Sequence, residues 1–126
     1  SRTEAGMAII GRLKLKAQIF RGGEPAIGPG KADLLEAIDR EGSISAAGRA
    51  MGLSYRRTWL LVDSLNRCWK ARVVETIAGG GRDKGARLTP FGRPGLETYR
   101  AFEAKLAAVT NDASYKTLIS LIRDES

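Results

Sequence analysis

Apolar and polar residues change their spacing several times along the chain, and these changes divide it into elements. Between Arg12 and Phe20 apolar and polar side chains alternate, which predicts a half-buried β-strand over 12–20. Residues 1–11 show no clear period, and we expect them to be partly disordered. Residues 21–30 are rich in glycine and proline and predict a connecting segment with turns.

Helical spacing begins after this connector. Leu34, Leu35 and Ile38 recur at helical intervals and predict a helix over 31–41 that stops at Gly42. We expect this helix to brace the next two from behind, as the first helix of a three-helix core does.

Residues 45–69 predict two short helices joined by a tight turn, the pattern of a helix-turn-helix. Ser45 stands where an N-cap belongs, and small apolar residues follow it at helical spacing until Gly52. Glycine tolerates the left-handed backbone that ends a helix. Ser54 is a second candidate N-cap, and the residues after it again place apolar side chains along one side of a helix.

The polar start of the second helix is the main functional candidate. Three large polar side chains follow Ser54 directly. In a helix-turn-helix this end of the second helix enters the DNA major groove, so hydroxyl and guanidinium groups there favour base or phosphate contact over a merely solvated surface. The DNA contacts predicted in this region are Ser43, Ser45, Ser54, Tyr55, Arg56 and Arg57.

A second basic segment follows the helix-turn-helix. Residues 73–88 predict a β-hairpin, or wing, with strand formers at both ends and the glycine-rich stretch AGGGRDKG between them. We expect Arg82, Lys84 and Arg87 to reach phosphates or the minor groove. A nucleotide-binding loop is disfavoured, because the glycines match neither phosphate-binding motif and the stretch leads into a strand rather than a helix.

Two helices are predicted at the carboxyl end, over 90–110 and 114–124. Thr89 and Pro90 have the character of an N-cap and a first helical residue. Pro94 lacks the N–H that a helix interior uses, so the regular helix either starts only near residue 93 or is kinked there. The last helix carries an apolar stripe that must pack somewhere, and a second subunit is the candidate.

Several of these motifs, in their order, resemble one family. GSIS, MGLSYR, a glycine-rich wing and LTPFG, between Gly42 and Gly92, are similar to the N-terminal DNA-binding domain of the ModE molybdate-responsive regulators. The resemblance implies a winged helix-turn-helix related to LysR-type domains. It would be mainly α with a small β-wing (α+β), with an N-terminal strand and a long C-terminal helix. Full-length members bind molybdate through C-terminal β-barrel domains, and we expect no molybdate site in this chain.

Charge adds to this picture. The formal net charge is +7, and between residues 54 and 88 eight basic residues accompany three acidic ones. This clustering beside a predicted helix-turn-helix favours a nucleic-acid partner over a basic surface that serves only solubility. A length of 126 residues with 43% hydrophobic content suits one compact domain.

Catalytic and redox chemistry are poorly supported. The chain has no histidine, so it contains neither a Ser-His nor a Cys-His pair, and its one cysteine cannot build a familiar zinc site alone. We interpret Cys68 as a core filler rather than a redox sensor, and Trp59 as structural rather than DNA-contacting. We therefore expect no enzyme activity, cofactor or metal.

The sequence thus predicts a transcriptional regulator of the ModE type that lacks the molybdate-binding domain and binds double-stranded operator DNA as a homodimer. The alternative is a winged-helix module that binds another protein and has no specific DNA site. No apolar run approaches membrane-spanning length and no signal-peptide pattern is evident, so we expect a cytoplasmic location and no membrane partner.

Overall fold

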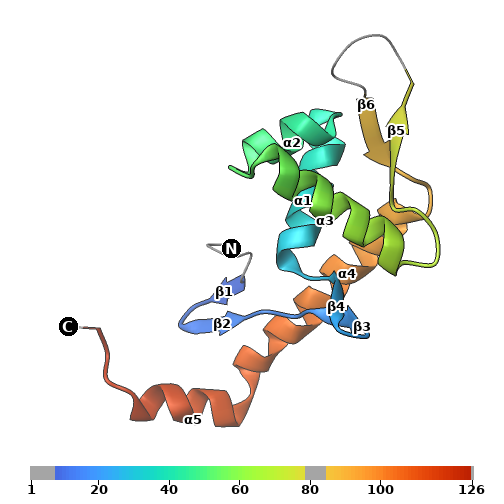
Figure 1. Ribbon diagram of the computed structural model, residues 1–126. Helices are drawn as coiled ribbons and strands as arrows, with labels where there is room; N and C mark the ends of the chain where they lie inside the picture. The colour runs from blue at the N-terminus through green and yellow to red at the C-terminus, as the bar shows by residue number, and fades with distance from the viewer. Residues whose placement is uncertain (1–7, 79–84, 126) are drawn as a thin grey trace.

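The computed structural model describes residues 8–78 and 85–125, in which helices combine with short antiparallel strand pairs (Figure 1). This α+β architecture confirms the predicted fold class and is consistent with a winged-helix-like domain. The strands of the described segments form three separate two-stranded sheets, each a hairpin of consecutive strands.

Two of the hairpins precede the helices. Their strands are β1 (Ala8–Ile10), β2 (Leu13–Leu15), β3 (Ile19–Arg21) and β4 (Glu24–Ile27). The single strand predicted over 12–20 is therefore wrong, because the backbone leaves the strand conformation over 16–18. Within the segment predicted to be partly disordered, 1–11, residues 8–10 form β1, and residues 1–7 lie outside the described part.

The predicted connector over 21–30 contains the second hairpin. Gly22 adopts a φ of 58°, in the left-handed region that favours glycine, and turns the chain between β3 and β4. The sequence does not predict β4, because Pro25 lies within it and glycines flank it, a composition that is typical of a loop. Only Ile27 of this strand is fully buried.

Three helices form the centre of the molecule (Figure 1): α1 (Pro29–Glu41), α2 (Ile44–Ala50) and α3 (Tyr55–Cys68). α1 starts with a proline at its first position, where no N–H is needed, and ends at Gly42 with a φ of 71°. Its apolar face is buried as predicted, and the fully buried large side chains there are Leu34, Leu35 and Ile38.

The third hairpin is the predicted wing, formed by β5 (Val74–Ile77) and β6 (Gly85–Leu88). Its base is buried, since Val74 and Leu88 pair across the strands and both are in the core. The Ala86 N–H donates to the Gly42 carbonyl at 2.8 Å, which attaches the wing to the connection between α1 and α2.

The long helix α4 (Gly92–Ala107) starts two residues after the predicted position. The N-cap is Phe91, without a side-chain cap, so the prediction of Thr89 as the N-cap was wrong, although Thr89 Oγ1 accepts a hydrogen bond from the Gly92 N–H at 2.8 Å. Pro94 falls in the first turn, where backbone N–H groups have no intrahelical acceptor, so the proline does not interrupt the helix. A 3₁₀ turn, η2 (Ala108–Asn111), links α4 to α5 (Ala113–Leu121).

An ion-pair cluster fixes α4 against α1. Arg100 of α4 donates to Asp33 at 2.6 Å and to Glu36 at 2.8 Å, and also to Glu103 of its own helix at 2.8 Å. Burial lowers the pKa of Arg100, but the hydrogen bonds to these three carboxylates outweigh it and the net shift is upward. The guanidinium group therefore stays charged and joins the two helices.

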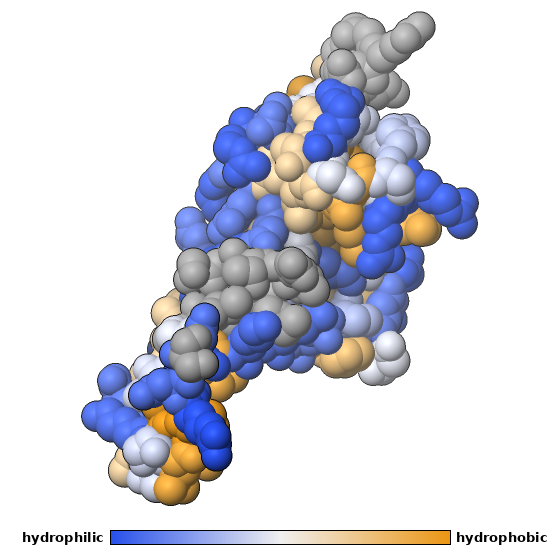
Figure 2. All heavy atoms as spheres, turned by 90° about the vertical axis from the view of Figure 1, so that its left-hand side faces the viewer, coloured by the Kyte–Doolittle hydropathy of each residue, from blue (hydrophilic) through white to orange (hydrophobic). Residues whose placement is uncertain are grey.

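The last helix lies apart from the three-helix centre (Figure 1). Leu118, Leu121 and Ile122 are 57%, 75% and 54% exposed, so its apolar stripe is largely uncovered. Figure 2 shows this apolar surface at the lower end of the molecule. The β1–β2 hairpin reaches the same end, because Arg12 donates to the Arg123 carbonyl at 2.9 Å.

Candidate nucleic-acid interface

α2, the first helix of the pair predicted as a helix-turn-helix, starts earlier than predicted. Ser43 is the N-cap of α2, because its Oγ accepts a hydrogen bond from the Ala46 N–H at 3.1 Å, whereas Ser45 lies inside the helix. The prediction of Ser45 as the cap was wrong because Ile44 opens the helix and enters the core. Both serines are half-buried, and their contact with DNA stays a prediction.

α2 and α3 cross very closely at one glycine. A β-carbon placed on Gly48 would lie 2.2 Å from Thr58 Oγ1, so only glycine fits this crossing without movement. Thr58 is itself buried and donates from Oγ1 to the Ser54 carbonyl at 2.8 Å. The turn between the helices uses Gly52 with a φ of 71°, as predicted, and the Leu53 N–H donates to the Gly48 carbonyl.

The amino end of α3 is capped and presents polar side chains to solvent. Ser54 Oγ accepts from the Arg57 N–H at 3.0 Å, which confirms Ser54 as an N-cap. Tyr55, Arg56 and Arg57 are all exposed, and neither arginine forms an ion pair with another described residue. The hydrogen-bonding groups at this end are therefore available for a partner.

Tyr55 is exposed yet braced. Its ring is 6.2 Å from that of Trp59, centroid to centroid, at 58° between the planes. Trp59 is half-buried against the core, and its ring nitrogen is buried without a hydrogen-bond partner among the described residues. This fits the structural role predicted for Trp59.

Exposed residues recur along α3 opposite its buried stripe. Thr58, Val62 and Leu65 are buried at helical spacing. The opposite side is exposed at every matching position, and its residues are Arg56, Leu60, Asp63 and Arg67. This outward stripe is the surface that a groove-binding helix would turn toward a duplex.

Asn66 fastens the carboxyl end of α3 to the start of the wing. Its Oδ1 accepts from the N–H groups of Val73 and Val74 at 2.8 and 3.1 Å, and its Nδ2 donates to the Val74 carbonyl at 3.1 Å. The side chain thus sets where β5 leaves the helix. Our sequence reasoning missed Asn66, although its place beside the buried Leu65 was a usable signal.

A polar cluster attaches the same end of α3 to the β3–β4 hairpin. Ser64 Oγ donates to Glu24 Oε2 at 2.7 Å and accepts from Lys31 Nζ at 2.7 Å, and Arg67 also pairs with Glu24. The Ser64 hydroxyl and then the Arg67 guanidinium lower the pKa of Glu24 to about 2. Burial lowers the pKa of Lys31. Since these polar and charged groups bond to one another, we interpret the cluster as a structural contact that anchors α3 to the hairpin.

The wing lies next to this helix end (Figure 1). Arg87 of β6 lies directly opposite Glu75 of β5, and its Nε donates to that carboxylate at 2.9 Å while the side chain remains exposed. Arg82 and Lys84, the other predicted wing contacts, lie outside the described residues. The wing's contact with DNA therefore stays a prediction.

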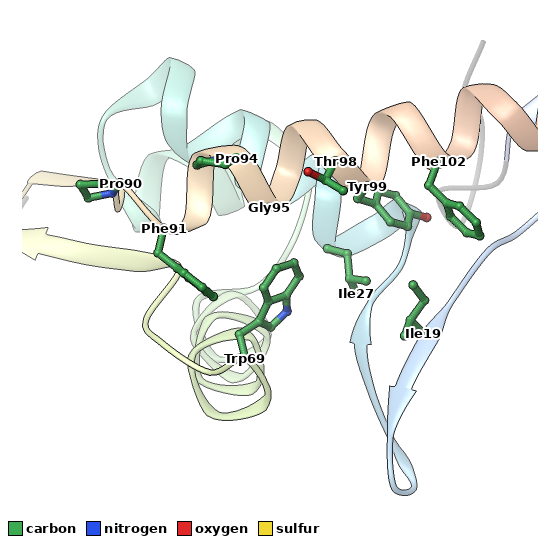
Figure 3. A pocket seen from close by; sticks show the side chains of 10 residues that line it. All are labelled: Ile19, Ile27, Trp69, Pro90, Phe91, Pro94, Gly95, Thr98, Tyr99 and Phe102. Atoms are coloured by element: carbon green, nitrogen blue, oxygen red, sulfur yellow. The ribbon is translucent and has the colours of Figure 1, made fainter.

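An apolar groove of about 640 Å³ opens on another face, between β3–β4, the end of α3 and the start of α4 (Figure 3). Trp69 forms part of one wall, with its ring 6.1 Å from Phe91 and nearly perpendicular to it. Its indole nitrogen donates to the Ala26 carbonyl at 2.9 Å, which fixes the ring. Ile19 and Phe102 at the other end are 50% and 42% exposed.

Other kinds of site are not evident in the described segments. No group of three or more histidine, cysteine or acidic side chains there is arranged to hold a metal ion. Nor is any helix in 8–78 or 85–125 both long and apolar enough to span a bilayer. Cys68 is half-buried near the end of α3.

Known proteins resemble this chain over most of its length. The molybdenum transport protein ModE of Azotobacter vinelandii is 43% identical over 70 residues, which are 56% of this chain and 26% of that protein. The molybdenum-pterin-binding protein MopB of Rhodobacter capsulatus is 44% identical over 81 residues, 64% of this chain and 30% of its own.

The DNA-binding transcriptional dual regulator ModE of Escherichia coli is 31% identical over 91 residues, 72% of this chain and 32% of that protein. No protein-family model matches the chain. These comparisons support the ModE-like resemblance, and the chain spans less than a third of the length of these curated relatives.

Proposed function

We propose that this chain is the winged helix-turn-helix unit of a sequence-specific transcriptional regulator of the ModE type. Relatives named as ModE transcriptional regulators support the regulatory role. The observation that carries DNA binding is the exposed Tyr-Arg-Arg start of α3, which Ser54 caps. The close packing of α2 and α3 at Gly48 holds this helix end in place. No molybdate site is assigned to these residues.

In this proposal α3 lies in the major groove with its amino-terminal residues nearest the base edges. Arginine forks there pair with guanine O6 and N7 or with phosphates, and the Tyr55 hydroxyl and the capping serines supply further polar contacts. The wing follows the backbone beside the helix, where Arg82, Lys84 and Arg87 neutralise phosphates.

The operator is bound by a two-fold dimer. The exposed apolar stripe of α5 and the β1–β2 hairpin beside it are the surfaces that a second copy would cover. Two recognition helices related in this way lie about 34 Å apart, one turn of DNA, so the site is roughly palindromic.

Selection of bound sequences from random duplexes, followed by salt titration, tests the function directly. We expect an enriched palindrome and an affinity that falls steeply as salt concentration rises. Replacing Arg82 or Lys84 with alanine should weaken binding to all sequences alike and flatten that salt dependence. Binding that is weak, sequence-independent and insensitive to salt would contradict the proposal.

The second candidate is a protein-docking module without a specific DNA site. The apolar groove beside Trp69 and the uncovered stripe of α5 favour it, because exposed apolar patches mark protein interfaces. It predicts no enriched sequence in the selection and a stable complex with a different protein.

A further inference from the structure

One apolar side chain stands on the outward stripe of α3. Leu60 is 48% exposed, and the other members of the stripe, Arg56, Asp63 and Arg67, are charged. Its neighbours Trp59 and Leu61 are half-buried and pack against the core, whereas Leu60 is not among the residues that do so and instead lines the wall of an open hollow beside α3. Core packing therefore does not account for a leucine at this position.

The position of Leu60 relative to Arg56 is fixed by helix geometry. Residues four apart lie on one face and are separated by about 6 Å along the axis. Successive bases of a strand are about 3.4 Å apart, so the two side chains would meet the groove roughly two base pairs apart. Leu60 thus belongs to the same reading surface as Arg56.

The edges of bases in the major groove are mostly hydrogen-bond donors and acceptors. The exception is the C5-methyl group of thymine, which apolar side chains contact. A leucine that exposes its methyl groups on a groove-facing stripe is complementary to this one feature. The other bases would leave its apolar surface against polar groups.

We propose that Leu60 is a specificity-determining residue that contacts the C5-methyl group of a thymine, about two base pairs from the pair read by Arg56. This inference rests on the proposed DNA-binding function. It adds to that function a base preference that the polar residues of α3 do not supply.

Uracil tests this contact cleanly, because it differs from thymine only by the absent methyl group. In the selected duplex each thymine is replaced by deoxyuridine in turn, and affinities are measured for the wild-type chain and Leu60→Ala. We expect the wild type to lose affinity about fourfold at one position in each half-site, the change expected for one buried methyl group. Leu60→Ala should show no such difference at that position.

Two further variants complete the test. Phe20→Ala removes a similarly exposed apolar side chain from β3, 53% exposed against 48% for Leu60, and should leave the thymine-to-uracil difference unchanged. Leu60→Gln should lose the methyl preference and, on reselection, shift the preference at that position toward adenine. The inference is wrong if both variants at Leu60 lose as much affinity as the wild type when that thymine is replaced by deoxyuridine. It is also wrong if replacing no thymine lowers the affinity of the wild type. In either case the proposed DNA binding stands. Absence of any preferred sequence would overturn both proposals.

Discussion

The two ends of α3 differ in what their side chains do. At the amino end Tyr55, Arg56 and Leu60 are exposed, and neither the Tyr55 nor the Arg56 side chain hydrogen-bonds to a described residue of another element. At the carboxyl end four side chains are hydrogen-bonded to other elements: Ser64, Arg67 and Trp69 to β4, and Asn66 to β5. The carboxyl end of α3 is therefore anchored to other elements, whereas the side chains of the amino end are exposed to solvent.

This division shows how a short helix can be rigid and still have free side chains. The fastened end fixes the helix axis, so the exposed end meets a partner without first being ordered, which reduces the entropy cost of binding. Substitutions at the carboxyl end should therefore change the free energy of unfolding. Those at the amino end should change affinity alone.

Asn66→Ala should have the largest effect. It leaves two N–H groups and one carbonyl at the start of β5 without their partner, and we expect the free energy of unfolding to fall by about 3 kcal/mol. Chemical denaturation measures this loss. Asn66→Asp should lose less, because a carboxylate oxygen still accepts from both N–H groups.

Asp63→Ala on the exposed side of the same helix is the control and should change the unfolding free energy by less than about 0.5 kcal/mol. An equal loss of unfolding free energy in Asn66→Ala and Asp63→Ala would mean that the hydrogen bonds of Asn66 do not anchor the carboxyl end of α3.

Gly48→Ala should have the next largest effect, at the crossing that positions the free end. The new methyl group overlaps Thr58 Oγ1, and we expect a loss of about 2 kcal/mol in the free energy of unfolding. Combining it with Thr58→Ala removes the clashing atom, so the double variant should lose less than the two single losses added together. Simple additivity in the denaturation midpoints would show that the two residues are not in contact.

The free end of α3 was more predictable from the sequence than the fastened end. Its cap at Ser54, its turn at Gly52 and its buried stripe follow from residues within a few positions of one another. The fastenings depend on pairs far apart in the chain, such as Ser64 with Glu24, which are 40 residues apart. Local periodicity contains no information about such pairs.

The wrong predictions for β4 and for the N-cap of α2 also arise from tertiary contacts that local sequence patterns do not contain. The proline and glycines around β4 predict a connector, whereas pairing with β3 stabilises a strand there. Ser45 fits the N-cap rule locally, but it is not the cap. The burial of Ile44, a tertiary effect, decides for Ser43.

Arg56→Ala tests the exposed amino end of α3. If the guanidinium group reads a base, affinity for the selected duplex should fall by about 1.5 kcal/mol, with a smaller loss on random DNA and an unchanged denaturation midpoint. Arg123→Ala removes the same charge from the far end of the molecule and should affect both duplexes slightly and equally. Equal losses on both duplexes for Arg56→Ala would assign it to phosphate instead.

Glu24→Gln should have the smallest effect and a distinctive pH dependence. The pKa of Glu24 is lowered to about 2, below the ordinary glutamate value of about 4.3, because Ser64 and then Arg67 stabilise its charged form. Its contribution to stability is therefore complete above the ordinary value and is lost as the pH falls toward about 2. The variant should be slightly less stable than the wild type at pH 7, and the two should converge in urea denaturation between pH 4 and pH 2.

The combination of Glu24→Gln with Arg67→Met separates the charge pair from the rest of the cluster. Once the guanidinium group is absent, the glutamine substitution should cost less at pH 7, because Arg67 is one of the two main stabilisers of the carboxylate. DNA affinity at pH 7 should stay close to that of the wild type in Glu24→Gln, since Asn66 and Trp69 still hold the helix. A large loss of affinity with little loss of stability would place Glu24 at the binding surface and break the division between the two ends of α3.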